Sequence, residues 1–237
     1  MSQLQEGGTA VALYPAVMPR RPRASTAGLI FHVVNRSAKR ALLFESPGDY
    51  AAFEHVLAAA IARSSVALFA YCVMPNHWHL LLSPHVDGAL SRCMHWLTTT
   101  HARRWQTVRG LDGQGAVYQG RFKSIPVGCD EHFLWVCRYV ERNALRASLV
   151  SRAEDWSWSS LARRHQDPLT SWLSEWPVPR PRDWSDIVNR PQTDAELQAF
   201  KTAVAKNEPF GRDEWKRSTM ARMGVLPARR GRPLVEK

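Results

Sequence analysis

Hydrophobic positions along residues 29–147 recur with two different periods, one typical of strands and one typical of helices. Short runs of β-branched and aromatic residues predict strands, whereas apolar residues three or four positions apart predict helices. Pro75 and Asn76 interrupt a long apolar stretch, so the strands on either side are expected to pair as a hairpin. The predicted elements are, in chain order, strand 29–36, helix 49–63, strand 66–74, strand 77–83, helix 89–108, strand 116–127 and helix 131–147.

The order of these elements predicts the fold class. The succession strand, helix, strand, strand, helix, strand is typical of a ferredoxin-like split βαβ sheet, and the helix at 131–147 is additional to that pattern. We therefore expect an α+β protein with a four-stranded antiparallel sheet and helices on one of its faces. The opposite face would be free, so that the additional helix could lie over it.

The rest of the chain differs in composition, which predicts its organisation. Residues 1–24, with glycines, prolines and arginines, are expected to form a flexible basic leader before a main domain at 25–165. Prolines and tryptophans at 166–192 predict an irregular but compact linker, because tryptophan side chains favour burial. Residues 193–226 are expected to form a small helical appendage, followed by a basic tail at 227–237.

Basic residues outnumber acidic ones and are concentrated in blocks. The chain has 32 Lys and Arg against 21 Asp and Glu, a formal net charge of +11, which points to a polyanionic partner. Residues 20–44 contain no acidic side chain. For each basic residue in these blocks, a solvated surface position is the alternative. The candidate phosphate contacts are Arg20, Arg21, Arg23, Arg36, Lys39, Arg40, Arg121 and Lys123.

The basic tail offers a second kind of DNA contact. Arg230 and Arg232 flank Gly231, and the Gly-Arg-Pro sequence is typical of segments that place arginine side chains in the minor groove of DNA. The motif is short and common, so a solvated tail is the alternative.

Two histidines, His77 and His79, stand on either side of Trp78 in a predicted strand. Because alternate side chains of a strand share a face, both imidazoles should point the same way while the tryptophan packs on the opposite side. Two neighbouring imidazoles can begin a divalent-metal site. The alternative is a half-buried polar pair without a metal.

A tyrosine and an asparagine in the last predicted helix of the main domain add to this pattern. Tyr139 and Asn143 are four positions apart, hence on one helical face. If that face lies over the two histidines, Asn143 supplies an oxygen ligand and Tyr139 a hydroxyl beside the metal. Such a mixed set suits Mg²⁺ or Mn²⁺ better than a structural zinc. A core aromatic residue and a surface amide are the alternatives.

At these motifs the chain resembles the REP-associated tyrosine transposases, which are relatives of the single-tyrosine HUH transposases of small insertion sequences. The resemblance covers about residues 24–165, and four motifs occur in the family's order. One departure is Ala144, where the family usually has proline. The motifs are Phe31–Arg36, Val73–Leu81, Gln119–Ser124 and Arg138–Asn143, the last followed by Arg146 and Ala147.

The resemblance implies specific roles for the candidate residues. His77, His79 and Asn143 would bind a divalent metal, Mg²⁺ or Mn²⁺, and Tyr139 would be the nucleophile. The implied activity is that of a metal-dependent single-stranded DNA endonuclease and strand transferase, which acts on hairpin-forming palindromes through a 5′-phosphotyrosine intermediate in DNA transposition. The implied partner is single-stranded or hairpin DNA, with no nucleotide cofactor and no membrane, and the protein would be a monomer or a homodimer.

Two other interpretations remain open from the sequence. A metal-dependent hydrolase or rolling-circle initiator shares the histidine pair, but the chain has no phosphate-binding loop of the kind found in an initiator's helicase domain. A catalytically silent or domesticated protein that binds DNA hairpins is the second alternative.

The cysteines and the hydropathy pattern predict the compartment. Cys72, Cys93, Cys129 and Cys137 have no Cys-x-x-Cys spacing, so we expect reduced, buried thiols. No apolar run approaches the roughly twenty residues needed to cross a bilayer. A cytoplasmic, nucleoid-associated protein is therefore expected.

Overall fold

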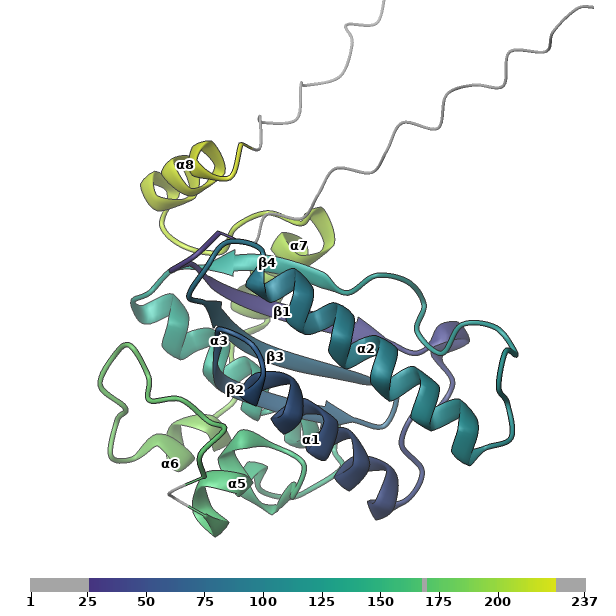
Figure 1. Ribbon diagram of the computed structural model, residues 1–237. Helices are drawn as coiled ribbons and strands as arrows, with labels where there is room; N and C mark the ends of the chain where they lie inside the picture. Colours follow the sequence, from purple (N-terminus) through teal and green to yellow (C-terminus); the bar gives the residue numbers. More distant parts are fainter. Residues whose placement is uncertain (1–25, 168–169, 225–237) are drawn as a thin grey trace, which may run out of the picture.

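Four antiparallel strands form the centre of the fold (Figure 1), in the order β2-β3-β1-β4. The computed structural model describes residues 26–167 and 170–224. The sheet confirms the predicted fold class, and the hairpin at Pro75 and Asn76 is present as expected. The strands are β1 (Ile30–Arg36), β2 (Val66–Met74), β3 (His77–Pro84) and β4 (Lys123–Val127).

Helices cover both faces of this sheet. Figure 1 shows α1 and α2 side by side in front of the strands, and α3 behind them. The first helix begins with a capping box, in which Ser46 and Asp49 satisfy each other's backbone N–H groups. The helices are α1 (Pro47–Ala62), α2 (Ala89–Val108), α3 (Glu131–Glu141), α4 (Asn143–Arg146), α5 (Ser160–Gln166), α6 (Trp184–Asn189), α7 (Asp194–Lys206) and α8 (Asp213–Arg222), with short 3₁₀ turns η1 (Ala38–Arg40) and η2 (Ala153–Asp155).

One face of the sheet packs against α1 and α2. Trp78 is fully buried there, with its ring 5.8 Å from that of Phe53 on α1. Its Nε1 donates to the hydroxyl of Tyr118, which also lies 2.8 Å from Nδ1 of His101 on α2. The hydroxyl of Tyr118 therefore bonds to both side chains. These three buried polar groups pair with one another inside the core.

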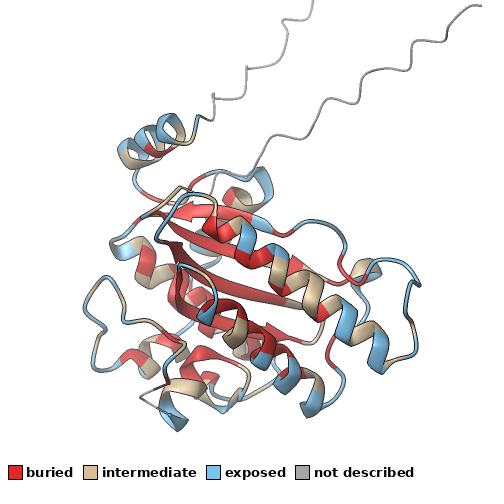
Figure 2. Cartoon of the chain, viewed as in Figure 1, coloured by how far each residue is buried: buried red, intermediate tan, exposed pale blue. Residues whose placement is uncertain are grey.

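The opposite face carries the additional helix α3, as predicted, and also α7, which was not expected there. Phe133 and Val136 of α3 are fully buried on it, and so is Phe200 of α7. In Figure 2 the strands are accordingly buried along most of their length. The helical period of residues 194–206 predicted a buried side for α7, but it carries no information on which surface that side would meet.

The fourth strand is shorter than predicted. Only Lys123–Val127 pairs with β1 as a strand, starting from Val34 opposite Lys123. Residues 116–122 instead curve away, held by a single bridge between Ser37 and Tyr118 and by the bond from Gln119 N to Arg36 O. Alternating side chains alone did not distinguish this curved segment from a strand.

The helix predicted at 131–147 breaks at Arg142, which separates α3 from α4. The guanidinium of Arg142 donates to the backbone oxygens of Val188 and Asn189. Ala144, the position where the resembling family has proline, is fully buried. The break therefore forms without a proline.

The segment predicted as a linker contains α6 and is attached to the main domain. Trp184 begins α6 and is 3% exposed, and its Nε1 donates to the buried carboxylate of Glu141 at 2.6 Å. Trp176 donates to the backbone oxygen of Phe69. Hydrogen bonds as well as burial thus fix these two tryptophans against the rest of the protein.

Both edges of the sheet are occupied by later parts of the chain. At β2, Val73 N donates to Trp158 O and Ser174 N to Leu68 O. At β4, Phe210 N donates to Pro126 O, and Gly128 N donates back to Phe210 O. The C-terminal third therefore pairs with backbone groups on both edges.

Three of the four cysteines match the prediction of buried thiols. Cys72, Cys93 and Cys137 are buried, but Cys129 is exposed because it lies in the loop between β4 and α3. Across the residues that the structure describes, no helix is long and apolar enough to span a membrane.

Candidate active site

His77 and His79 lie on the sheet face covered by α3 and α7, as their spacing predicts. His79 is 6% exposed and His77 is half-buried, and their ring centroids are 5.0 Å apart. The register pairs Val34 with His79 and Arg36 with His77, so β1 brings Arg36 beside the first histidine. Trp78 points into the opposite core, which fixes the orientation of the strand.

Each of these histidines uses Nδ1 within the protein. His77 Nδ1 donates to Asn76 Oδ1 at 2.7 Å, and His79 Nδ1 lies 2.9 Å from Nε2 of His32. In the tautomer in which His79 donates, the Nε2 atoms of both rings keep their lone pairs. Metal-bound histidines usually have this arrangement, with the second ring nitrogen bonded to a neighbour. The donor set therefore fits a divalent ion.

Tyr139 projects from α3 toward the same histidines. Its ring centroid is 5.7 Å from that of His79, and it is 8% exposed. Phe200 of α7 covers it, with ring centroids 4.6 Å apart, and Trp135 stacks beside it. The predicted nucleophile and the predicted histidine ligands are thus brought together, under a helix from the C-terminal appendage.

Asn143 begins α4, four residues after Tyr139, and both ends of its amide are engaged. Its Nδ2 donates to the backbone oxygen of Tyr139 at 3.3 Å, while its Oδ1 accepts from Nη2 of Arg146. Arg146 also lies over the Tyr139 ring, with Cζ 4.2 Å from the ring centroid. The amide oxygen predicted to bind a metal is therefore hydrogen-bonded to a guanidinium.

Burial dominates the electrostatics of the site. It lowers the pKa of His77 to about 4 and that of His79 well below its ordinary value, with Arg36 and Arg146 acting in the same direction. Both rings are neutral at pH 7, as coordination requires. Burial raises the pKa of Tyr139, whereas the charges of Arg146 and Arg36 oppose that rise.

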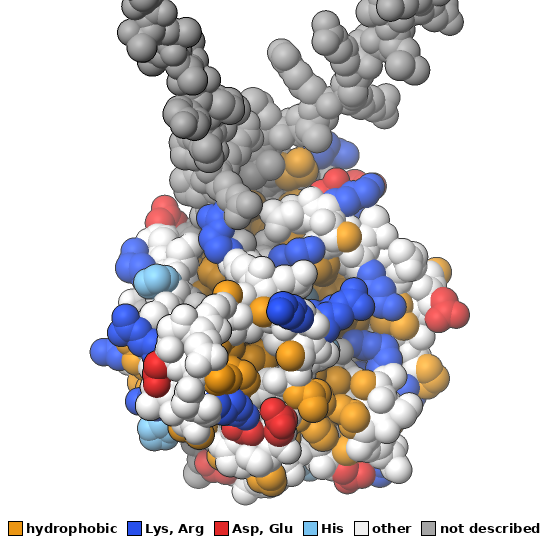
Figure 3. Space-filling model, turned by 90° about the vertical axis from the view of Figure 1, so that its right-hand side faces the viewer, with side chains coloured by type: hydrophobic (Ala, Val, Ile, Leu, Met, Phe, Trp, Pro, Cys, Tyr) orange, Lys and Arg blue, Asp and Glu red, His pale blue; other side chains and the backbone are white. Residues whose placement is uncertain are grey.

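A cavity of about 470 Å³ opens beside Tyr139 and His79. Among the described residues that line it, four are basic and none is acidic: Arg36, Arg121, Lys123 and Lys201. A neighbouring groove of about 590 Å³ runs along α2 and shares Asn35, Gly120 and Arg121 with the cavity. Figure 3 shows Lys and Arg side chains gathered around the middle of one face of the molecule. The site is therefore open to an anionic, extended ligand.

The predicted DNA contacts divide into three groups. Arg36, Arg121 and Lys123 line the cavity beside Tyr139. Lys39 and Arg40 lie in η1 and are exposed, and neither of them lines that cavity. The others lie outside the described residues: Arg20, Arg21, Arg23, Arg230 and Arg232.

Three residues of the site were not among the sequence candidates. His32 is 1% exposed, and no hydrogen-bond partner of its Nδ1 is found within the described residues. Arg146 and Lys201 supply charge close to Tyr139. His32 and Arg146 both belong to the family-like motifs, and Arg146 follows Asn143 by three positions on a helix, which was the available signal.

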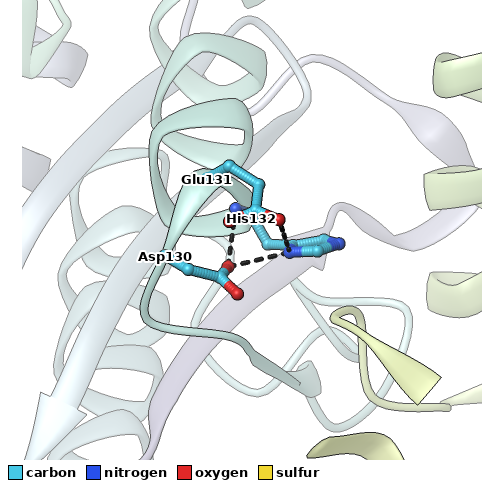
Figure 4. Close-up of side chains that lie close together, drawn as sticks. All are labelled: Asp130, Glu131 and His132. Atoms are coloured by element: carbon cyan, nitrogen blue, oxygen red, sulfur yellow. Dashed lines mark hydrogen bonds and ion pairs between the residues drawn. The ribbon is translucent and has the colours of Figure 1, made fainter. Parts of the chain in front are cut away.

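A second cluster of metal-ligating residue types lies at the start of α3. Figure 4 shows the side chains of Asp130, Glu131 and His132 close together. Asp130 Oδ1 accepts from both the backbone N and the Nδ1 of His132, and Glu131 pairs with Arg212 at 2.8 Å. These bonds cap α3 and attach the segment before α8, which accounts for the cluster without an ion.

Solved structures resemble the fold of this chain. No curated protein matches the sequence. A REP-associated tyrosine transposase bound to a REP hairpin has a similar fold, with a TM-score of 0.50, 18% identity, and coverage of 67% of this chain and 93% of that one. A candidate transposase from Deinococcus radiodurans R1 is 17% identical, with a TM-score of 0.38, over 52% of this chain and 95% of that one.

The family model Transposase IS200 like matches residues 25–143, which is half of the chain and includes the histidine pair, Tyr139 and Asn143. This match and the shared fold agree with the resemblance inferred from the motifs. The chain belongs to the family of IS200-like transposases.

Proposed function

We propose that the protein cleaves single-stranded DNA beside a hairpin and joins strands through a covalent bond to Tyr139. The observation that carries this proposal is the contact of Tyr139 with His79, the neighbour of His77, at a cavity lined by basic residues and, among its described residues, by no acidic one. Family membership supports the reaction class. The hairpin in the structurally similar transposase suggests the kind of substrate.

The chemistry assigned to the tyrosine is a transfer of the phosphoryl group. Tyr139 Oη attacks the scissile phosphorus, the bond from phosphorus to the 3′ oxygen breaks, and the phenol proton is released as the leaving oxygen takes one up. The products are a 5′-phosphotyrosine and a free 3′-hydroxyl. Because the new bond retains the energy of the old phosphodiester, a second 3′-hydroxyl can reverse the reaction and join strands.

His77, His79 and Asn143 are the residues that would hold a divalent ion. When bound, Mg²⁺ or Mn²⁺ would polarise the scissile phosphate and stabilise the charge that develops on it. Arg36 and Arg146 lower the pKa of Tyr139 against the effect of burial, so these arginines favour the phenolate that attacks. Arg121, Lys123 and Lys201 are placed to bind phosphates along the strand.

One observation favours a second function, the binding of DNA hairpins without cleavage. Tyr139 is 8% exposed beneath Phe200, and Asn143 Oδ1 is engaged by Arg146. A protein that remained in this arrangement would bind DNA at its basic cavity and leave the backbone intact.

A denaturing gel distinguishes the two functions. The full-length protein is incubated with Mg²⁺ or Mn²⁺ and a hairpin oligonucleotide with a single-stranded extension, labelled at its 3′ end or its 5′ end. Cleavage through a 5′-phosphotyrosine transfers only the 3′ label to the protein, while the 5′ label moves to a shorter free strand. Tyr139→Phe should lose the covalent band and retain binding. Tyr50→Phe, on the opposite face of the sheet, is the matched control and should keep the band.

Each outcome has a defined meaning. A covalent band that depends on Tyr139 supports the nuclease and strand transferase. Hairpin binding with no band in either metal supports the binding function instead. Absence of any hairpin binding contradicts both.

A further inference from the structure

Arg146 is a partly buried cation without an anionic partner in the described structure. Its guanidinium lies over Tyr139 and donates to Asn143 Oδ1 and, at 3.4 Å, to the backbone oxygen of Tyr139. None of the ion pairs found among residues 26–167 and 170–224 includes it. Removing a guanidinium from water is costly unless an anion compensates. Arg146 is therefore placed to bind the anionic group of a ligand.

The surroundings of Arg146 indicate the nature of that anion. Asn143 and the Tyr139 carbonyl satisfy two of its five donors, both with neutral acceptors. The planar fork of a guanidinium matches phosphate oxygens in a bidentate arrangement. The adjacent cavity has basic residues and no acidic residue among its described lining, so a phosphate of a DNA strand fits better than a protein carboxylate.

Arg146 also opposes the binding of a metal. Its guanidinium is hydrogen-bonded to the same Asn143 oxygen that the proposed function assigns to a divalent ion. Two positive groups on one oxygen repel each other, and the repulsion is strong where water is excluded. As long as Arg146 stays on Asn143, the two histidines have no third protein ligand from this helix.

We propose that Arg146 binds a phosphate of the DNA strand and, in doing so, releases Asn143 Oδ1, so that DNA and the divalent ion bind cooperatively. This inference rests on the proposed function, because it uses the same cavity and the same ligands. Arg146 exchanges a neutral acceptor for an anionic one. The exchange links the two binding events, and linkage requires the effect to be equal in both directions.

The inference predicts the size and symmetry of the coupling. Saturating DNA should raise the affinity for Mn²⁺ by about tenfold, within the usual range for coupled sites, and saturating Mn²⁺ should raise the DNA affinity by the same factor. Replacing Arg146 by a neutral residue should raise the affinity for Mn²⁺ in the absence of DNA, weaken DNA binding without metal, and bring the coupling factor close to one.

The test is a set of Mn²⁺ titrations followed by electron paramagnetic resonance of the free ion. Full-length Tyr139→Phe serves as the parent, because it keeps the aromatic ring under Arg146 and leaves the oligonucleotide uncut. Titrations are run with and without the hairpin oligonucleotide, and ion binding to the oligonucleotide alone is subtracted. Arg146→Gln is compared with Arg121→Gln, which removes a cation from the cavity lining without touching Asn143.

Arg121→Gln should weaken DNA binding and keep the coupling factor of the parent, whereas Arg146→Gln should abolish the coupling. If Arg146→Gln does not fold, Arg146→Lys replaces it, because a compact ammonium cannot hold Asn143 and the Tyr139 carbonyl together. Arg146→Lys should raise the affinity for Mn²⁺ without DNA by a smaller factor. Unchanged coupling in the folded Arg146 variant would overturn the inference.

The two proposals fail in different ways. If the protein with Tyr139 intact forms the covalent band and an Arg146 variant of the parent keeps full coupling, this inference is overturned and the proposed function stands. A parent that binds no Mn²⁺ even with DNA overturns the inference together with the proposed metal site.

Discussion

The two faces of the sheet differ in how their buried polar side chains are hydrogen-bonded. On the face covered by α1 and α2, Trp78 donates to Tyr118, whose hydroxyl bonds to His101, and this chain of polar groups is closed within the core. On the face covered by α3 and α7, His32 Nδ1 is buried with no hydrogen-bond partner among the described residues, and the Arg146 cation has none of the described carboxylates beside it.

This difference distinguishes a core that stabilises the fold from a site that has kept binding capacity. Buried polar groups are normally hydrogen-bonded, because an unpaired one costs about 1 to 3 kcal/mol. On the first face Trp78, Tyr118 and His101 meet this rule with one another. The second face leaves hydrogen-bond donors and acceptors free for a ligand. Trp78 and His79 are neighbours on β3 but belong to different faces.

The largest expected difference is in stability. Trp78→Ala should lower the free energy of unfolding by about 3 to 5 kcal/mol, because it removes a fully buried ring and leaves a cavity. His77→Ala, one position earlier on β3, should cost less than about 1 kcal/mol but abolish metal-dependent cleavage. Urea unfolding and the denaturing gel measure the two effects. Equal destabilisation by both substitutions would contradict the division into core and site.

Acid should weaken the core through His101. Burial lowers the pKa of His101 to about 4 from 6.5, so between these pH values the unfolded chain binds a proton that the folded protein does not. The free energy of unfolding should therefore fall as the pH drops from 6.5 to 4, by about 3 kcal/mol from this residue. Urea unfolding over this range measures the fall.

His101→Asn keeps an acceptor for the Tyr118 hydroxyl but does not titrate, so it should remove that part of the pH dependence. His95→Asn, on the exposed side of α2, is the control and should follow the parent. A His101→Asn protein with the same slope as the parent would remove His101 from this role.

A smaller effect is expected at His32, whose Nδ1 has no hydrogen-bond partner among the described residues. His32→Phe keeps a ring against Phe200 but removes the partner of His79 Nδ1, so the affinity for Mn²⁺ should fall about 10- to 100-fold while the fold is kept. Isothermal titration calorimetry measures the affinity. His132→Gln, in the cluster that caps α3, is the control, and a larger loss in that variant would place the metal there instead.

The smallest predicted effect concerns the salt dependence of DNA binding. Arg121→Gln should reduce the slope of log affinity against log salt by about one, because one phosphate contact is lost. Arg104→Gln, exposed on α2 and outside the lining of the cavity, should leave the slope unchanged. Fluorescence anisotropy at several salt concentrations measures both, and identical slopes would show that the cavity does not bind the strand.

The sequence predicted those parts of the fold that depend on local pattern. The bounds of β2 and α2 agree with the predicted ones, because an uninterrupted apolar run and a long amphipathic period are both local. The strand predicted at 116–127 was too long, since its first half forms the rim of the cavity at Gln119, Gly120 and Arg121. The segment that lines the cavity and a true strand have the same alternation of side chains. Only the pairing with β1 distinguishes them.

The site was predicted as far as chemistry and spacing reach. The His77 and His79 pair could be found because both lie on one strand. The Tyr139 and Asn143 pair could be found because only the short break between α3 and α4 separates them. His32 is 47 positions from its partner His79, and their contact depends on the register between β1 and β3. The cover over Tyr139 comes from Phe200, whose position depends on the path of the whole C-terminal third.

The position of the C-terminal third should also affect whether copies of the protein aggregate at high concentration. The open edges of a sheet are templates on which other chains add strands and aggregate. Here Trp158 and Ser174 pair with backbone groups of β2, and Phe210 bonds to Pro126 O and Gly128 N, on either side of Val127. An incoming strand would have to displace the protein's own segments, so the folded protein should remain dispersed at concentrations where a chain shortened by residues 156–224 would aggregate.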